Sequence, residues 1–223
     1  MTHAVLREGS PSRPPAIGAG LQVVDRLDGV KVDGVIVAIH PKLAPWVCQA
    51  ALRQGLPVMV EKPAALSVGE AEALERAERE SGRIVLVSHQ HLFAEGFEAM
   101  RKMGVPISSF ATWGGPEVHD FPHAWDYGPH AAAATLALGA RIPMWVVLKG
   151  AVKTATVQAI YDDDMAFTYD AYASQAELPL TRAVRAFAQA IRDGGTEDYR
   201  FGAHWAADVA RSIEATVKPS KLS

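Results

Sequence analysis

Polar residues that can transfer protons follow three apolar runs of the sequence, at the points where each run ends. They are His40-Pro41, Glu61-Lys62-Pro63 and Ser88-His89-Gln90-His91. In an open sheet of parallel strands, ligands bind outside the carboxyl ends of the strands, so these three segments are candidate site residues. A solvated loop is an equally good interpretation of any one of them taken singly.

Lys62, Asp126 and His130 have the side chains best suited to proton transfer. A lysine beside apolar walls can have a depressed pKa and then serve in proton transfer, whereas the alternative interpretation of Lys62 is a surface lysine at a strand end. Asp126 and His130 are four residues apart at the entry to a helix, so they share one face if that turn is helical. An aspartate can orient a histidine, and a histidine exchanges protons near neutral pH. A capping aspartate beside a helix-entry histidine is the other interpretation.

Alternating apolar and amphipathic segments must position these residues. Short β-branched runs, typical of strands buried on both faces, cover residues 32–39, 56–60 and 84–87. Helical spacing covers residues 43–53, and a second helix starts at Ser67, with Glu70 three residues later as in a capping box, and ends at Gly82. The order predicts a βαβαβ unit with a parallel sheet.

The pattern changes after about residue 105. We expect a strand over residues 107–113 that is broken by Gly114-Gly115-Pro116, and an irregular loop over 116–130 that leads into a helix over 131–138. Further strands are predicted over 145–148, 154–160 and 167–172, with a turn at Asp162-Asp163-Asp164, and helices over 180–191 and 203–216. The predicted fold is α/β: an incomplete Rossmann-like parallel sheet with helices on both faces (residues 1–105), followed by a reduced α+β domain for substrate binding or oligomerisation (residues 106–223).

Composition narrows the class of protein. The chain has 223 residues, 49% of them hydrophobic, and a formal net charge of -3, which argues against disorder and against a nucleic-acid-binding surface. Its single cysteine, Cys48, lies among apolar residues of a predicted helix and cannot form an internal disulfide. No signal peptide or membrane-spanning run is present, so we expect a cytoplasmic protein without membrane partners.

Together these motifs resemble the glucose–fructose oxidoreductase/inositol dehydrogenase (Gfo/Idh/MocA) family. The resemblance is carried by residues 33–41 and 50–63, which end in Glu61-Lys62-Pro63, by residues 67–93, and by Asp126-x-x-x-His130. It extends over most of residues 21–140 and again over 178–216. It implies an NAD(P)-dependent oxidoreductase that transfers a hydride between nicotinamide and a hydroxyl or carbonyl group of a sugar, sugar derivative or cyclitol.

The resemblance also implies roles for individual residues. His130 would exchange the hydroxyl proton, Lys62 would polarise the hydroxyl while contacting the cofactor, and Asp126 would orient both. Ile39, His40, Pro41 and Glu61 would line the nicotinamide side, together with Lys62. Substrate-binding candidates are His89, His91, Trp125 and Tyr127, for which loop or core packing is the alternative. Family members pair through the open face of the second sheet, so a homo-oligomer is expected.

The sequence departs from the family at its start. We find no Gly-x-Gly-x-x-Gly turn after a strand, so Ile17-Gly18-Ala19-Gly20 is predicted to be a loop and the first βα unit to be missing. Val5-Leu6-Arg7 is similar to the end of the family's second strand. Arg7, Ser10 and Arg13 would then face the adenosine ribose, where arginine suits the 2′-phosphate of NADP, and NADP is slightly favoured over NAD. A flexible basic loop is the alternative.

A second hypothesis follows from the missing turn. The chain would be a truncated or degenerate relative that does not bind dinucleotide alone and acts as a non-catalytic binding or assembly protein. A metal site is not predicted, because the histidines have no cysteine or paired acidic residue at ligand spacing. The identity of the substrate and the direction of the reaction are not encoded in any motif.

Overall fold

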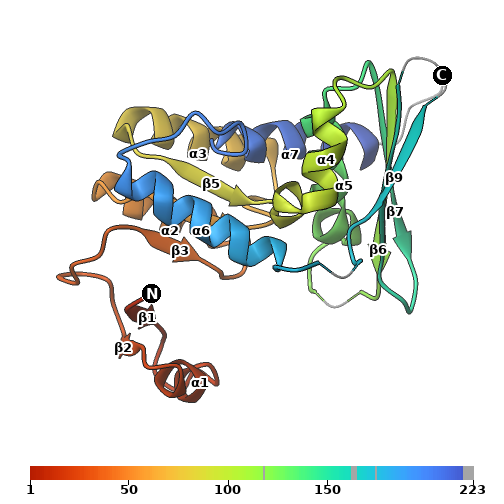
Figure 1. Ribbon diagram of the computed structural model, residues 1–223. Helices are drawn as coiled ribbons and strands as arrows, with labels where there is room; N and C mark the ends of the chain where they lie inside the picture. Colours follow the sequence, from red (N-terminus) through yellow and green to blue (C-terminus); the bar gives the residue numbers. More distant parts are fainter. Residues whose placement is uncertain (118, 162–164, 174, 218–223) are drawn as a thin grey trace. The chain divides into compact units, whose positions relative to one another are not determined.

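The computed structural model describes residues 1–117, 119–161, 165–173 and 175–217 (Figure 1). The chain forms two compact units, Met1–Asp33 and Gly34–Ser223. The domain boundary predicted after residue 105 falls within the second unit and stays a prediction. The turn predicted at residues 162–164 lies outside the described residues. Within the described ranges, no helix is both long and apolar enough to cross a membrane.

The unit Met1–Asp33 is a small βαβ arrangement. Strands β1 (His3–Val5) and β2 (Gln22–Val24) pair in parallel, and the short helix α1 (Arg13–Gly18) connects them. The loop predicted at residues 17–20 is therefore wrong for its first two residues, which end α1. The physical reason is the pair Pro14-Pro15 in the first turn, because proline presets φ for a helix start and needs no backbone donor there.

The sheet of the second unit consists of β3 (Val35–Val37), β4 (Val58–Glu61) and β5 (Val85–Ser88), all parallel and in that order. Helices α2 (Ala44–Arg53) and α3 (Val68–Ser81) connect them, so the predicted βαβαβ unit is confirmed. Ser67 Oγ accepts a hydrogen bond from the Glu70 amide at 3.3 Å, and Gly82 ends α3 with φ of 62°. Figure 1 shows α3 and α7 along one side of this sheet and α6 along the other.

A second sheet contains four strands in the order β7-β6-β8-β9. Strand β6 (Ser108–Gly115) runs parallel to β7 (Ile142–Lys149) and antiparallel to β8 (Thr154–Ile160), which pairs with β9 (Ala166–Asp170). The break predicted at Gly114-Gly115 is wrong, because both glycines continue β6. A side chain at Gly114 would overlap the Leu148 carbonyl oxygen of β7, so glycine here permits close strand approach.

Helix α5 (His123–Leu138) starts eight residues before the predicted start at 131, which corrects the expected loop over 116–130. Proline inside a helix removes one backbone hydrogen bond, so Pro129 disfavours a helix that passes through it. Burial offsets that loss: all but two residues of α5 are buried, including the run of alanines at 131–134, and the helix packs against β6, β7 and α7.

Two elements after β5 were not predicted: the 3-10 turn η1 (Gln90–Phe93) and helix α4 (Glu95–Lys102). Only Phe97 and Met100 of α4 are buried. Two apolar positions are too few to reveal the 3.6-residue repeat by which a helix is recognised in a sequence. The C-terminal helices α6 (Pro179–Arg192) and α7 (His204–Val217) confirm the predicted ones.

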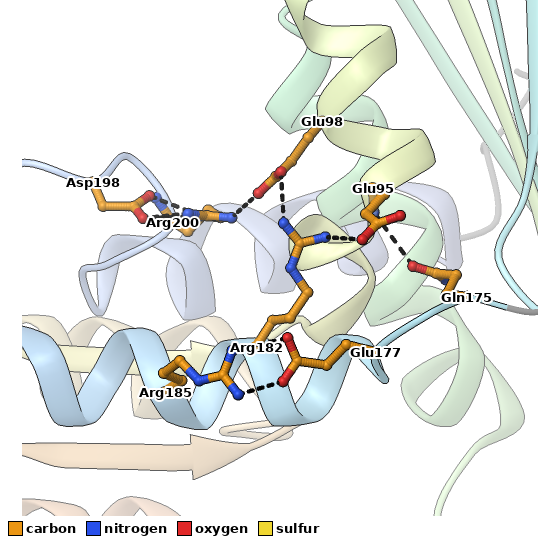
Figure 2. Close-up of polar contacts among 8 residues, drawn as sticks. All are labelled: Glu95, Glu98, Gln175, Glu177, Arg182, Arg185, Asp198 and Arg200. Carbon is orange, nitrogen blue, oxygen red and sulfur yellow. Dashed lines mark hydrogen bonds and ion pairs between the residues drawn. The ribbon is translucent and has the colours of Figure 1, made fainter.

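An ion network joins α4 to α6 and to the segment before α7. Figure 2 shows the Glu98 carboxylate reaching both Arg182 and Arg200, at 2.9 and 2.7 Å. Arg200 also pairs with Asp198, and its guanidinium packs over the Phe93 ring, 4.0 Å from the ring centre. The network thus fixes η1, the turn that follows the third strand end.

Candidate active site

The carboxyl ends of β4 and β5 lie side by side. Glu61, the last residue of β4, is paired with Ser88, the last residue of β5. Lys62 and His89 follow directly, so the chain leaves both strands at the same edge of the sheet. The Lys62-Pro63 peptide bond is cis. Burial is the main cause that raises the pKa of Glu61, and the Lys62 ammonium opposes that rise.

Lys62 and Asp126 form the central contact of the site. Lys62 Nζ donates to the backbone carbonyl of Asp126 at 2.8 Å and to its Oδ1 at 3.1 Å. The two side chains are only 14% and 8% exposed, so the ion pair is largely shielded from water. Because α5 already includes residue 126, His130 follows on the same face one turn later.

The His130 ring packs against the rings of Trp113 and His91. The Trp113 ring stacks on it with centres 5.8 Å apart, and the His91 ring meets it edge-on at 4.8 Å. Its Nδ1 is buried and has no hydrogen-bond partner. The pKa of His130 lies well below its ordinary value, mainly because the ring is buried and also because the Lys62 charge is near. At neutral pH the imidazole is therefore neutral and can accept a proton.

His89 and His91, the predicted substrate residues after β5, are both buried beside this group. Burial, followed by the Lys62 charge, lowers the pKa of His89 to about 3 and that of His91 to about 4. Both ring nitrogens of His89 and Nδ1 of His91 lack hydrogen-bond partners. The His89 ring contacts Trp205 of α7, with centres 6.2 Å apart.

The turn after β3 holds the predicted nicotinamide-side residues Ile39, His40 and Pro41. Ile39 is 45% exposed, whereas Pro41 is buried. His40 Nε2 lies 2.7 Å from Asp120 Oδ1, and this contact joins the turn to the loop before α5. In that loop His119 stacks on Phe121, and its Nε2 is 3.8 Å from Asp126 Oδ1.

The predicted residues Arg7, Ser10 and Arg13 belong to the unit Met1–Asp33. Arg13 Nη1 donates to Asp25 Oδ1 and to the Leu6 carbonyl, both at 2.7 Å. Arg7 is exposed, and Ser10 accepts a hydrogen bond from the Ser12 amide at 3.3 Å. Arg13 is thus already paired, whereas the Arg7 guanidinium faces solvent.

Trp125 and Tyr127 are buried in α5. Tyr127 Oη donates to the Pro116 carbonyl at 3.1 Å, and its ring tilts against His123. Their assignment to substrate binding stays a prediction. Tyr172, which contacts His91 with ring centres 6.0 Å apart, was missed, because it follows β9 in a segment with no recognisable motif. Across the described ranges, no group of three or more metal-ligating side chains could hold an ion.

Part of the chain matches a known protein family. The model of the Gfo/Idh/MocA group, described as an oxidoreductase family with an NAD-binding Rossmann fold, matches residues 20–89. No curated protein sequence matches the chain.

Solved structures match over most of the chain. A protein described as an oxidoreductase, from Magnetospirillum magnetotacticum, has a TM-score of 0.77 at 21% identity, covering 94% of this chain and 89% of its own. UDP-N-acetylglucosamine 3-dehydrogenase from Acidithiobacillus ferrooxidans has a TM-score of 0.76 at 14% identity, covering 93% and 86%. The 3-ketoreductase KijD10 from Actinomadura kijaniata, in complex with NADP, has a TM-score of 0.72 at 17% identity, covering 92% and 84%.

These matches define an α/β protein with a Rossmann-like parallel sheet, which confirms the predicted fold class. The resemblance to the Gfo/Idh/MocA family is confirmed over residues 20–89, the part of the chain that matches the NAD-binding Rossmann model of this oxidoreductase family.

Proposed function

We propose that the chain transfers a hydride between the nicotinamide of NAD(P) and a hydroxyl or carbonyl carbon of a sugar, sugar derivative or cyclitol. The observation that carries the proposal is the bidentate contact of Lys62 Nζ with Asp126, which anchors a cation beside the neutral His130. Support for a sugar-like substrate comes from the similar structures, which include a UDP-N-acetylglucosamine 3-dehydrogenase and a 3-ketoreductase.

In the oxidation direction, the neutral His130 imidazole accepts the proton of the substrate hydroxyl as the C–H bond breaks. Lys62 stabilises the negative charge that develops on the oxygen, because its ammonium is held in a largely water-free setting. Asp126 holds the ammonium in position through its backbone carbonyl and its Oδ1. When bound, NAD(P) supplies the hydride acceptor or donor. In reduction, His130 returns the proton.

The residues at the strand ends fit the nicotinamide end of such a cofactor, since they combine apolar side chains with the Lys62 cation. The nicotinamide would be lined by Ile39, His40, Pro41, Glu61 and Lys62. Arg7, Ser10 and Arg13 remain the proposed ribose and 2′-phosphate residues. The sequence contains no Gly-x-Gly-x-x-Gly turn for the pyrophosphate.

The proposal extends to a homo-oligomer that forms through the outer face of the second sheet. Apolar side chains are exposed on this face in three neighbouring strands: Phe110 of β6, Ile142, Met144 and Leu148 of β7, and Ile160 of β8. Such a patch favours association. Sedimentation of the wild type and of the Phe110→Glu variant compares their oligomeric states. We expect the variant to dissociate, and a monomeric wild type would contradict the proposed oligomer.

The test of the main proposal is a titration of the purified chain with NADH and NADPH, followed by nicotinamide fluorescence. We expect micromolar binding, and tighter binding of NADPH that Arg7→Ala weakens more than Arg13→Ala, because Arg13 is held by Asp25. Absence of binding up to millimolar dinucleotide, with a folded protein, would favour the non-catalytic relative. Hydride transfer to nucleotide-linked and free ketosugars then tests the substrate class.

A further inference from the structure

Residues 119–121, in the loop before α5, connect two parts of the candidate site. At one end, Asp120 Oδ1 lies 2.7 Å from Nε2 of His40, in the turn after β3. At the other end, His119 Nε2 lies 3.8 Å from Asp126 Oδ1. The segment therefore joins the turn that would line the nicotinamide to the central contact of the site.

Phe121 connects these two ends through ring contacts. Its ring stacks on His119, with centres 5.0 Å apart and planes 6° from parallel, and it meets the His40 ring edge-on at 5.7 Å. An isolated ion pair at the surface contributes little, because water and salt screen it. Here the contact between His40 and Asp120 is supported by the partly buried Phe121, whose packing limits how far the His40 ring can turn.

Both ring nitrogens of His40 have a partner within the protein. The Lys42 amide donates to His40 Nδ1 at 3.2 Å, so Nδ1 is an acceptor. In the neutral ring the proton is therefore on Nε2, which donates to Asp120 Oδ1. This hydrogen bond lowers the pKa of Asp120, which keeps the carboxylate ionised as a strong acceptor. His40 would thus contact a nicotinamide through its ring carbons rather than through a hydrogen bond.

We propose that Asp120 is a positioning residue that acts through His40 and holds the turn after β3 in the conformation that binds the nicotinamide. The inference rests on the proposed function, because it takes Ile39, His40 and Pro41 as the nicotinamide side. Ile39 is 45% exposed, so its side chain is accessible to a ligand. A turn that is already fixed before the cofactor arrives loses less conformational freedom on binding, and this strengthens the affinity.

The charge of Asp120 alone predicts the opposite effect. The Asp120 side chain is 71% exposed, and its negative charge repels the phosphates of a dinucleotide. Removing only the charge would tighten binding, whereas removing the hydrogen-bond acceptor would free the His40 ring and loosen the turn. Asp120→Asn and Asp120→Ala separate the two effects, because asparagine keeps a side-chain oxygen that can accept from His40 Nε2.

The test measures the affinity for NADPH by nicotinamide fluorescence. We expect Asp120→Ala to weaken binding about threefold to fivefold, as the loss of one partly exposed hydrogen-bonded pair allows. Asp120→Asn should bind as tightly as the wild type or more tightly. Glu117→Ala is the matched control, because Glu117 is an exposed carboxylate of the same loop that pairs with Lys149 of β7 instead of the turn. Its affinity should stay close to that of the wild type.

A double-mutant cycle tests whether Asp120 acts through His40. In the His40→Ala background, Asp120→Ala should have no further effect on NADPH affinity. NMR of isotope-labelled histidine rings should show the proton of neutral His40 on Nε2, with the His40→Ala spectrum assigning the signal, and Asp120→Ala should lose this protected proton. Urea unfolding checks that each variant is folded, and the midpoints should stay close to that of the wild type, because Asp120 is exposed.

Equal or tighter NADPH binding by Asp120→Ala, an effect of that variant that persists in full without His40, or a ring proton on Nδ1 of His40 would overturn the inference and leave the proposed function standing. A folded wild type that binds no dinucleotide would instead contradict the proposed function, and the inference would be lost with it. The ring proton is measured without cofactor, so it distinguishes the two failures.

Discussion

The unit Gly34–Ser223 contains two polar clusters with partly buried charges: the ion network around Glu98 and the group around Lys62. They differ in how many of their polar atoms have a partner. In the network of α4, α6 and residues 198–200, Arg182 and Arg200 share Glu98, and Arg200 has Asp198 as a second partner (Figure 2). Around Lys62, the ammonium is paired with Asp126, whereas buried ring nitrogens of His89, His91 and His130 have no hydrogen-bond partner in the described part of the chain. Paired charges fix elements to one another, whereas unpaired groups held rigidly are suited to a ligand.

The Lys62→Met variant should have the largest effect, because it removes both the proposed catalytic cation and the charge partner of the buried Asp126 carboxylate. Removing the cation should lower kcat by about a thousandfold. It also leaves the buried Asp126 carboxylate unpaired, which should cost about 3 kcal/mol of folding stability. Steady-state kinetics and urea unfolding measure the two losses. Lys102→Met, at an exposed position of α4, is the control, and stability recovered in Lys62→Met/Asp126→Asn would confirm the cause.

His130→Gln should affect turnover more strongly than stability, because it removes the proposed proton acceptor. Glutamine cannot take up the substrate proton, so kcat should fall by about a hundredfold to a thousandfold. Because the buried His130 ring also stacks on Trp113, the unfolding midpoint should fall moderately, and kcat is measured where the variant is fully folded. A variant with normal kcat would remove His130 from the proposed mechanism.

The histidines should make folding stability dependent on pH in a defined direction. The pKa of each is lower in the folded state than in the unfolded chain, so the unfolded state binds more protons on acidification. Their contribution is complete above about pH 6.5 and is lost as the pH falls toward 4, by about 1.4 kcal/mol per pH unit for each histidine. Glu61 and Glu78, with raised pKa values, act in the opposite sense.

Urea unfolding between pH 7 and pH 4.5 checks this dependence, with these values chosen to bracket the ordinary histidine range of about 6.5. His89→Phe should flatten the curve by close to one proton. A stability that is flat over this range in the wild type would show that the histidines are not buried in solution.

Arg200→Met should have the smallest effect on catalysis and a moderate effect on folding. The variant leaves Glu98 with Arg182 but deprives Asp198 of its partner, and we expect a loss of about 2 kcal/mol. Dinucleotide affinity should change less than about threefold, because the network contacts no proposed cofactor residue. A larger fall in affinity would mean that the network and the site are coupled through η1.

The sequence determined the parts of the protein that depend on local patterns. The buried runs that became β3, β4 and β5, the Ser67 cap and the amphipathic face of α6 were predictable, because periodicity and capping act over a few residues. Lys62, Asp126 and His130 were singled out by their positions and side-chain chemistry, whereas the family resemblance implied their roles, which remain proposals.

Only the tertiary structure decided the features that depend on distant parts of the chain. Burial carries α5 through Pro129, which no local rule favours, and close approach of β7 lets Gly114 continue a strand. The neutral state of His91 and His130 arises from burial beside Lys62, a residue 29 and 68 positions away in the sequence. Desolvation and charge act through space, so the chemistry of these imidazoles is set by packing rather than by any motif.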